Sequence, residues 1–199
     1  MVPSKQRSVL ITGCSEGGIG DALAQAFHAR GLRVFATARD LSKVSHLQKL
    51  GLTILELEVT SESSIKDCVS SVTKLTGGTL DILVNNSGSG YSSPILDVDI
   101  NQAKKIMDVN FFGRVAVTQG FAPLVIKSKG IILNIGSIGS ACPSLWSAMY
   151  GATCAAVDQW NNVLRLELEP FGVRVVIVSL CFNSTVEQTL ITNRSSPGL

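Results

Sequence analysis

Short apolar runs alternate along the chain with longer stretches in which apolar residues recur at helical spacing. The runs predict strands, at residues 9–11, 34–37, 52–59, 82–84, 131–135 and 173–178. The stretches between them predict helices, at residues 19–30, 40–50, 61–75, 100–126 and 148–168. This alternation predicts an α/β fold with a doubly wound parallel sheet and right-handed crossovers. Pro123 is expected to kink or end its helix.

The bulk composition suits one α/β domain over residues 1–199, because 45% of the residues are hydrophobic and only 16% are charged. The net charge of +2 supplies no basic stripe, so nucleic acid is not an expected partner. The polar N-terminus shows no secretory signal, and no stretch approaches the ~20 apolar residues of a membrane span. Together these features predict a cytoplasmic protein without an integral membrane span.

The five cysteines show neither close pairs nor metal-ligand spacing with the two histidines. They predict reduced thiols in the core or in loops, and no metal site.

A glycine-rich turn, residues 12–20, joins the first predicted strand to the first predicted helix. Gly13 permits the tight turn, while Gly18 and Gly20 let backbone approach a pyrophosphate and let helix pack on strand. The helix N-terminus adds N–H groups and a favourable dipole end. The segment therefore predicts a dinucleotide site, with the cofactor-binding candidates Thr12, Gly13, Ser15, Gly18, Ile19 and Gly20.

This turn resembles the TGxxxGxG fingerprint of short-chain dehydrogenases/reductases, with one extra residue. The Gly-Gly-Ile-Gly run and residues 35–39 are similar to fungal NADPH-dependent acyl-dihydroxyacetone-phosphate reductases. The resemblance extends over about residues 9–180 and implies a Rossmann-type fold. It also implies an NADP-dependent oxidoreductase of a carbonyl or hydroxyl group, acting on an apolar small molecule such as an acyl-chain compound.

The end of the second predicted strand bears on the choice between NAD and NADP. A carboxylate there would bind a ribose 2′-hydroxyl, but the chain has Thr37, Ala38 and Arg39, with no acid until Asp40. An arginine fork favours a 2′-phosphate, and hence NADP. The alternative is that Arg39 is a solvated residue at the start of a helix. Glu16 is a counter-signal, because the family often has a basic residue near that point.

Two further positions match the family near the adenosine. Glu58 stands where the family usually has an aspartate, and its longer side chain could keep that contact or displace it. Asn85 opens an Asn-Asn-Ser-Gly segment that resembles the family's NNAG motif, which fixes the end of the fourth strand.

Carbonyl reduction needs a proton donor beside the developing alkoxide. Ser137 follows the fifth predicted strand and Tyr150 opens the next helix, as the corresponding residues do in the family. The resemblance makes Tyr150 the general acid/base, with a further contact to the cofactor, and Ser137 the partner of the substrate oxygen. It makes Asn110 the support of a water in the proton relay.

One family residue is missing. The lysine expected four positions after the tyrosine is replaced by Cys154. In the family that lysine lowers the pKa of the tyrosine and holds the nicotinamide ribose, whereas a neutral thiol brings no charge. Three hypotheses stay open: an active oxidoreductase, a catalytically impaired cofactor-binding relative that acts by association, and a fragment without a function of its own.

The C-terminal end also departs from the family. After the sixth predicted strand the family usually has Pro-Gly, a substrate loop, further helices and a seventh strand, whereas residues 181–199 form a divergent polar tail. We therefore expect a C-terminally shortened sheet whose sixth strand is a bare edge. We also expect a homodimer through the two long helices, with the plausible interface residues Val115, Ala116, Val157 and Trp160.

Overall fold

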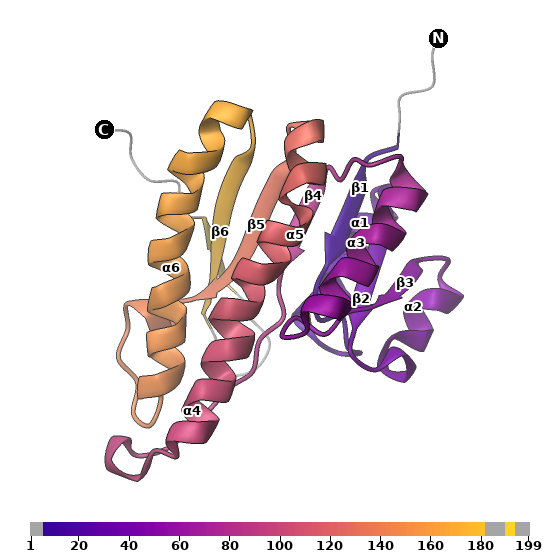
Figure 1. Cartoon of the computed structure of the whole chain (residues 1–199). Coiled ribbons are helices and arrows are strands. Elements are labelled where there is room, and N and C mark those ends of the chain that lie inside the picture. The colour runs from indigo at the N-terminus through magenta and orange to yellow at the C-terminus, as the bar shows by residue number, and fades with distance from the viewer. Residues whose placement is uncertain (1–5, 182–189, 194–199) are drawn as a thin grey trace.

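A computed structural model describes residues 6–181 and 190–193 of the chain (Figure 1). The strands are β1 (Ser8–Ile11), β2 (Arg33–Ala38), β3 (Thr53–Glu56), β4 (Ile82–Asn85), β5 (Ile131–Ser137), β6 (Arg174–Cys181) and β7 (Leu190–Asn193). The helices are α1 (Ile19–Ala29), α2 (Ser45–Lys49), α3 (Glu62–Thr76), α4 (Ile100–Met107), α5 (Gly113–Ser128) and α6 (Ala148–Leu168). Short 3₁₀ turns occupy Leu41–Val44, Ile95–Asp97, Ile138–Ser140 and Glu169–Phe171, and a π turn occupies Asp108–Phe112.

The described strands form one sheet in the order β3-β2-β1-β4-β5-β6-β7, and the first six are parallel. This arrangement confirms the predicted doubly wound α/β fold of the Rossmann type. The order reverses at β1, so the chain passes to opposite sides of β1 in its two halves. The carboxyl ends of β1 and β4 therefore flank the crevice in which such folds bind ligands.

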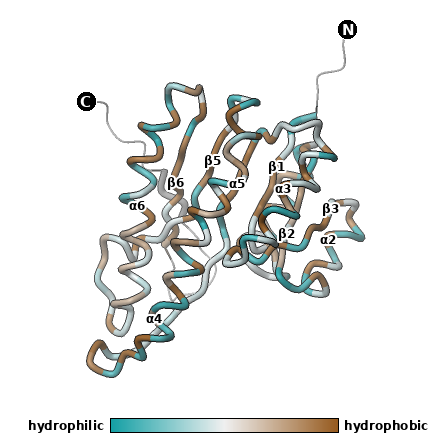
Figure 2. The backbone as a smooth tube through the Cα atoms, in the orientation of Figure 1, coloured by the Kyte–Doolittle hydropathy of each residue, from teal (hydrophilic) through white to brown (hydrophobic). Residues whose placement is uncertain are grey.

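The alternation of side chains along β1 explains how both faces of the sheet are covered. Val9 and Ile11 point to the face covered by α1 and α2, whereas Leu10 points to the face covered by α3, α5 and α6. All three are fully buried. Figure 1 shows α3, the rod formed by α4 and α5, and α6 side by side on one face. Figure 2 shows the central strands as hydrophobic segments between these layers.

The sixth strand is not a bare edge, so that expectation is wrong. β7 pairs with β6 in the antiparallel direction, with Cys181 opposite Leu190 and Val178 opposite Asn193. The strand begins with Leu190 and Ile191, an apolar pair too short to stand out in an otherwise polar tail. Its four residues satisfy backbone groups of β6 through pairing, which does not require an apolar run.

Pro123 does not end its helix, because α5 continues through it to Ser128. Phe121, Leu124 and Val125, on either side of the proline, are buried on the sheet. Their packing outweighs the cost of about 3 kcal/mol that proline imposes in a helix interior. The helical geometry changes earlier, at the π turn between α4 and α5.

The rod from Ile100 to Ser128 bears on the expected absence of a membrane span. By length and composition alone it could cross a membrane, with 29 residues and a mean hydropathy of 1.2 in its most apolar window. Here 44% of that window is buried inside the protein. Val117, Phe121 and Val125 of the rod are fully buried in the core that packs on the sheet.

Two of the four expected interface residues face the protein's own interior. Val157 is only 3% exposed, and Ala116 packs against the core beneath α5. Helical spacing alone does not separate residues that pack on the chain's own sheet from residues that could face a second subunit. Trp160 lies edge-on to Phe111, with 6.4 Å between the ring centroids.

Candidate active site

Two adjoining pockets lie at the carboxyl ends of the strands. The turn pocket is lined by the glycine-rich turn, the end of β2 and the segment after β3, with Gly13, Ser15, Gly18, Ile19, Arg39 and Glu58 among its residues. The tyrosine pocket contains Asn110, Arg114, Ser137, Tyr150 and Cys154. Ile19, Asn86, Gly88 and Ser89 line both pockets. A single extended ligand could therefore run from one into the other.

At Gly13 and Gly20 the backbone of the glycine-rich turn leaves no room for a side chain. Gly13 has a φ of +73°, and a Cβ there would lie 2.9 Å from the Ser87 Oγ. A Cβ on Gly20 would collide with the Gly13 carbonyl oxygen and lie 2.6 Å from the Asn86 Nδ2. The N-cap of α1 is Gly18, and no side chain caps the helix. The first amides of α1 are therefore open to an anion, and the turn fits a pyrophosphate group.

Thr12 ties this turn to the loop after β4. Its Oγ1 accepts hydrogen bonds from the backbone N–H groups of Asn86 and Ser87, each at 2.9 Å. The Asn86 Nδ2 donates in return to the carbonyl oxygens of Thr12 and Gly13, again at 2.9 Å. The two loops that border the turn pocket are thus held together by four bonds, which pre-organises the pocket.

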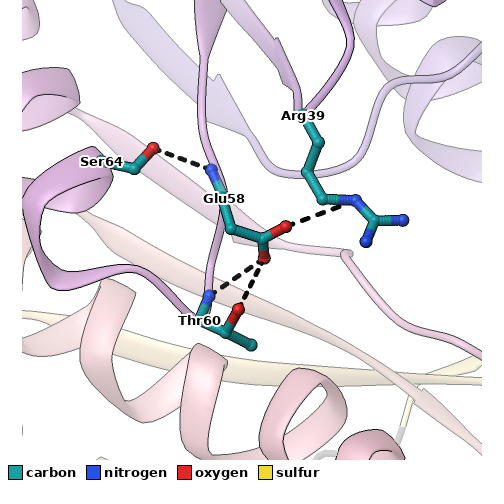
Figure 3. Close-up of polar contacts among 4 residues, drawn as sticks. All are labelled: Arg39, Glu58, Thr60 and Ser64. Atoms are coloured by element: carbon teal, nitrogen blue, oxygen red, sulfur yellow. Dashed lines mark hydrogen bonds and ion pairs between the residues drawn. The ribbon is translucent and has the colours of Figure 1, made fainter.

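An ion pair stands on the rim of the turn pocket (Figure 3). The Arg39 Nε lies 3.6 Å from the Glu58 Oε2, and the Arg39 side chain is 73% exposed. Glu58 is itself held, since its Oε1 accepts from the N–H and Oγ1 of Thr60 at 3.1 and 3.0 Å. Figure 3 shows the head of the guanidinium turned away from the carboxylate. Among the described residues nothing binds its two terminal nitrogens.

Ser137 and Tyr150 reach the tyrosine pocket from consecutive elements. Ser137 is the last residue of β5, and its Oγ accepts from the Gly139 N–H at 3.1 Å, which starts a 3₁₀ turn. Tyr150 lies in the first turn of α6 and is half-buried. The turn and the loop between them fold the chain back, so that both hydroxyl groups line the same pocket.

Asn110 occupies the middle of the π turn between α4 and α5. Its Oδ1 accepts from the Ser89 N–H at 2.8 Å, and its Nδ2 donates to the Ser89 carbonyl oxygen at 2.9 Å. The same Nδ2 donates to the Thr153 Oγ1 at 3.1 Å. Asn110 therefore links the loop after β4 to α6. Single π turns inside helices are frequent at functional sites.

Both acidic groups of the tyrosine pocket are held protonated. Burial raises the pKa of the Tyr150 phenol, and Cys154 raises it further. A hydrogen bond with Ser137 and the charge of Arg114 lower this pKa, but the net direction is upward. Burial also raises the pKa of the Cys154 thiol. At neutral pH the pocket therefore contains a neutral phenol and a neutral thiol.

The sequence of residues 7–194 matches the family model for short chain dehydrogenase. The chain belongs to the short-chain dehydrogenase family. It is 50% identical over 175 residues to a short-chain dehydrogenase of Penicillium ochrochloron, covering 87% of this chain and 65% of the relative. It is 45% identical over 173 residues to an NADPH-dependent 1-acyldihydroxyacetone phosphate reductase of Schizosaccharomyces pombe, covering 87% of this chain and 58% of that protein.

A solved structure gives the same result for the fold. A metagenomic short-chain oxidoreductase in complex with NADP superimposes with a TM-score of 0.78 at 28% identity, covering 87% of this chain and 81% of that one. The chain thus has the fold of the short-chain dehydrogenases, while it spans about 58–65% of the length of the two curated relatives.

Several residues that the short-chain dehydrogenase motifs place at the cofactor belong to the scaffold here. Thr12 is buried in the contacts described above. Thr37 is fully buried, and its Oγ1 donates to the Ile11 carbonyl oxygen at 3.0 Å. Asn85 donates to Thr118 and Asn134, each at 2.9 Å. These residues set the shape of the turn pocket without lining it.

Arg114 is the residue of the tyrosine pocket that the sequence analysis missed. Its Nη1 donates to the Ile135 carbonyl oxygen at 2.6 Å, and its Nη2 to that of Ser87 at 3.4 Å. Burial lowers the pKa of the guanidinium, but arginine keeps its positive charge in proteins. Its position four residues after Asn110 was the available signal, because such spacing brings side chains to one face of a helix.

Proposed function

We propose that this short-chain dehydrogenase is an NADP-dependent oxidoreductase that interconverts a carbonyl and a hydroxyl group in an apolar small molecule. The observation that carries the proposal is the meeting of Ser137, Asn110 and Tyr150 in one pocket that opens into the turn pocket. Such continuity would let a dinucleotide in the turn pocket extend to the tyrosine.

The preference for NADP is supported by the rim of the turn pocket. Arg39 offers two terminal nitrogens, which can bind a 2′-phosphate in a bidentate manner. Glu58 contacts the guanidinium at its Nε, so this ion pair leaves the two terminal nitrogens available. The S. pombe relative is named as NADPH-dependent, and the solved metagenomic relative is complexed with NADP. Both are consistent with this preference.

The chemistry would divide between the cofactor and the tyrosine pocket. Bound NADPH supplies a hydride to the carbonyl carbon. Tyr150, which is protonated at neutral pH, would then donate a proton to the developing alkoxide. The Ser137 hydroxyl would hold the same oxygen, and Asn110, through its anchorage on Ser89, would support a water that returns a proton to Tyr150.

An apolar substrate is supported by exposed apolar side chains on two neighbouring segments, one after β4 and one before α6. Leu96 is 94% exposed and Leu145 is 81% exposed, and Ile95 and Trp146 are exposed as well. The two segments that bear them are joined, since the Ser93 N–H donates to the Trp146 carbonyl oxygen at 2.9 Å. Figure 2 shows the segment leading into α4 as hydrophobic. Exposed apolar patches of this kind mark binding sites.

A carbonyl series tests this proposal. The full chain is incubated with NADPH and ketones of increasing acyl chain length, and NADPH consumption is followed by absorbance. We expect kcat/KM to rise roughly threefold to fourfold for each methylene that becomes buried, until the patch is filled. The matched control is NADH at equal concentration, which should support slower turnover. If the chain binds NADPH but consumes it with none of the ketones, the result would contradict the oxidoreductase proposal and favour the second candidate.

The second candidate is a cofactor-binding relative that acts by association. It is favoured by the uncharged Cys154 beside Tyr150 and by the raised pKa of the phenol. Exposed apolar residues on the outer layer, Phe112, Val163 and Leu166, would then serve pairing with a second copy of the chain. Light scattering at micromolar concentration separates a homodimer from a monomer.

A further inference from the structure

We propose that Arg114 is a positioning residue for Tyr150, whose buried guanidinium stabilises the negative charge that the phenol acquires when it gives up its proton. The inference rests on the proposed oxidoreductase function, in which Tyr150 exchanges a proton with the substrate oxygen. It assigns the cation of the tyrosine pocket to α5, on which the sequence motifs place no charged group.

The position of the charge is fixed by the ends of two strands. Arg114 is 8% exposed, and its two terminal nitrogens donate to carbonyl oxygens that follow β4 and lie within β5, those of Ser87 and Ile135. A long side chain held at both nitrogens has little rotational freedom. The charge therefore stays at one place in the pocket, as electrostatic stabilisation without reorganisation requires.

No carboxylate neutralises this charge among the described residues. The three ion pairs found there involve Arg39, His46 and Lys66, and none includes Arg114. Of the described residues that line the tyrosine pocket, Arg114 alone carries a positive charge. Its Nε is also buried and binds no partner within the described part of the chain. A buried cation without a counter-ion is costly for folding, so its presence points to a functional role.

The groups that face Tyr150 come from three elements. Ser137 at the end of β5 lowers the pKa of the phenol, Cys154 on α6 raises it, and Arg114 on α5 lowers it. Arg114 acts on Cys154 in the same sense, whereas Asp158, one helical turn further along α6, raises the pKa of that thiol. With the thiol neutral at physiological pH, Arg114 is the charged group that favours the phenolate.

The test is a pH titration of the phenolate by near-ultraviolet absorbance. The chain has two tyrosines, Tyr91 and Tyr150, so a Tyr91→Phe parent leaves the signal of Tyr150 alone. In that parent, Arg114→Met should move the midpoint upward by about one pH unit or more, as expected for loss of a neighbouring opposite charge. Arg114→Lys keeps the positive charge, so its midpoint should lie close to that of the parent. An unchanged midpoint in a folded Arg114→Met protein would overturn the inference.

A second variant covers the case in which Arg114→Met does not fold. Arg114→Gln keeps a donor for the two strand carbonyls but removes the charge, and it should raise the midpoint in the same direction. If Tyr150 in the Gln variant titrates with the same midpoint as in the parent, Arg114 only links the two strands and the inference is overturned. The titration needs no substrate. If the chain reduces carbonyls but the titration midpoint of Tyr150 does not depend on Arg114, this inference alone is overturned. If the midpoint depends on Arg114 but the chain reduces no carbonyl, the proposed function alone is overturned.

Discussion

The two pockets of this protein are built by different means. The turn pocket is made mainly of backbone, with glycines where a Cβ would collide and with an exposed ion pair on its rim. The tyrosine pocket is made of side chains that arrive from α5, α6, the π turn and the end of β5. Its cation is buried and has no carboxylate partner among the described residues.

This difference sets how each pocket responds to substitution. In the turn pocket, substitutions should act through space, because a Cβ at Gly13 or Gly20 would come too close to neighbouring atoms. In the tyrosine pocket, substitutions should act mainly through charge, because electrostatic interactions are stronger where polar groups are buried and the dielectric is low. Substitutions in the two pockets should therefore separate binding of cofactor from transfer of the proton.

Tyr150→Phe should have the largest effect. Removal of the phenolic hydroxyl takes away the proton donor, and general acid catalysis is worth about 10²–10⁴ in rate. We expect turnover to fall by that factor while NADPH affinity changes less than about twofold. Steady-state kinetics and fluorescence titration measure the two quantities. Tyr91→Phe is the matched control, and a similar loss in both variants would contradict the assignment.

Gly20→Ala tests whether the turn pocket needs the close backbone approach at Gly20. The added methyl group would collide with the Gly13 carbonyl and crowd Asn86, so we expect a loss of about 1–3 kcal/mol in the free energy of unfolding, together with weaker NADPH binding. Gly90→Ala is the control, since a Cβ at Gly90 meets nothing within 4 Å. Thermal melting compares the two. Equal melting temperatures would show that the close approach at Gly20 is not needed.

Arg39→Ala should remove most of the preference for NADPH over NADH. A charged hydrogen bond is worth about 1.5–3 kcal/mol, so the affinity ratio should fall by roughly ten- to a hundredfold. Affinity for NADH should stay nearly constant, because that cofactor lacks the 2′-phosphate. Fluorescence titration of both cofactors checks this. A ratio that is already close to one in the unsubstituted chain would refute the role of Arg39.

Glu58→Gln should have the smallest effect. The carboxylate beside Arg39 repels a 2′-phosphate, and an exposed ion pair contributes only about 0.2–1 kcal/mol. We expect NADPH affinity to rise by no more than about fivefold, with the gain lost in the Arg39→Ala background. A drop in affinity would instead mean that Glu58 mainly orients the guanidinium.

The order of the elements was predictable because apolar periodicity follows directly from burial on a sheet. Val9, Leu10 and Ile11 form a fully apolar run, as expected for a strand buried on both faces. Features decided by tertiary contacts were not predictable. The continuation of α5 through Pro123 depends on packing, and β7 depends on pairing with β6, which its composition does not reveal.

The candidate site divides in the same way. The residues of the glycine-rich turn were found because the turn is continuous in sequence. The scaffold positions of Thr37 and Asn85, and the contact between Arg39 and Glu58, arise from segments that meet only after folding. Arg114 escaped notice because a single arginine in a helix is usually solvated, and only the packing of α5 against β4 and β5 buries it.

The most direct test of the account is the pH dependence of turnover in the two directions. Tyr150 must be protonated to act as the acid in reduction and deprotonated to act as the base in oxidation, and its pKa lies above the usual value of about 10. The account predicts that reduction by NADPH is constant over roughly pH 6–9, whereas oxidation of the alcohol by NADP rises about tenfold per pH unit. Both activities should collapse in Tyr150→Phe. Rates in both directions that are independent of pH and survive Tyr150→Phe would contradict it.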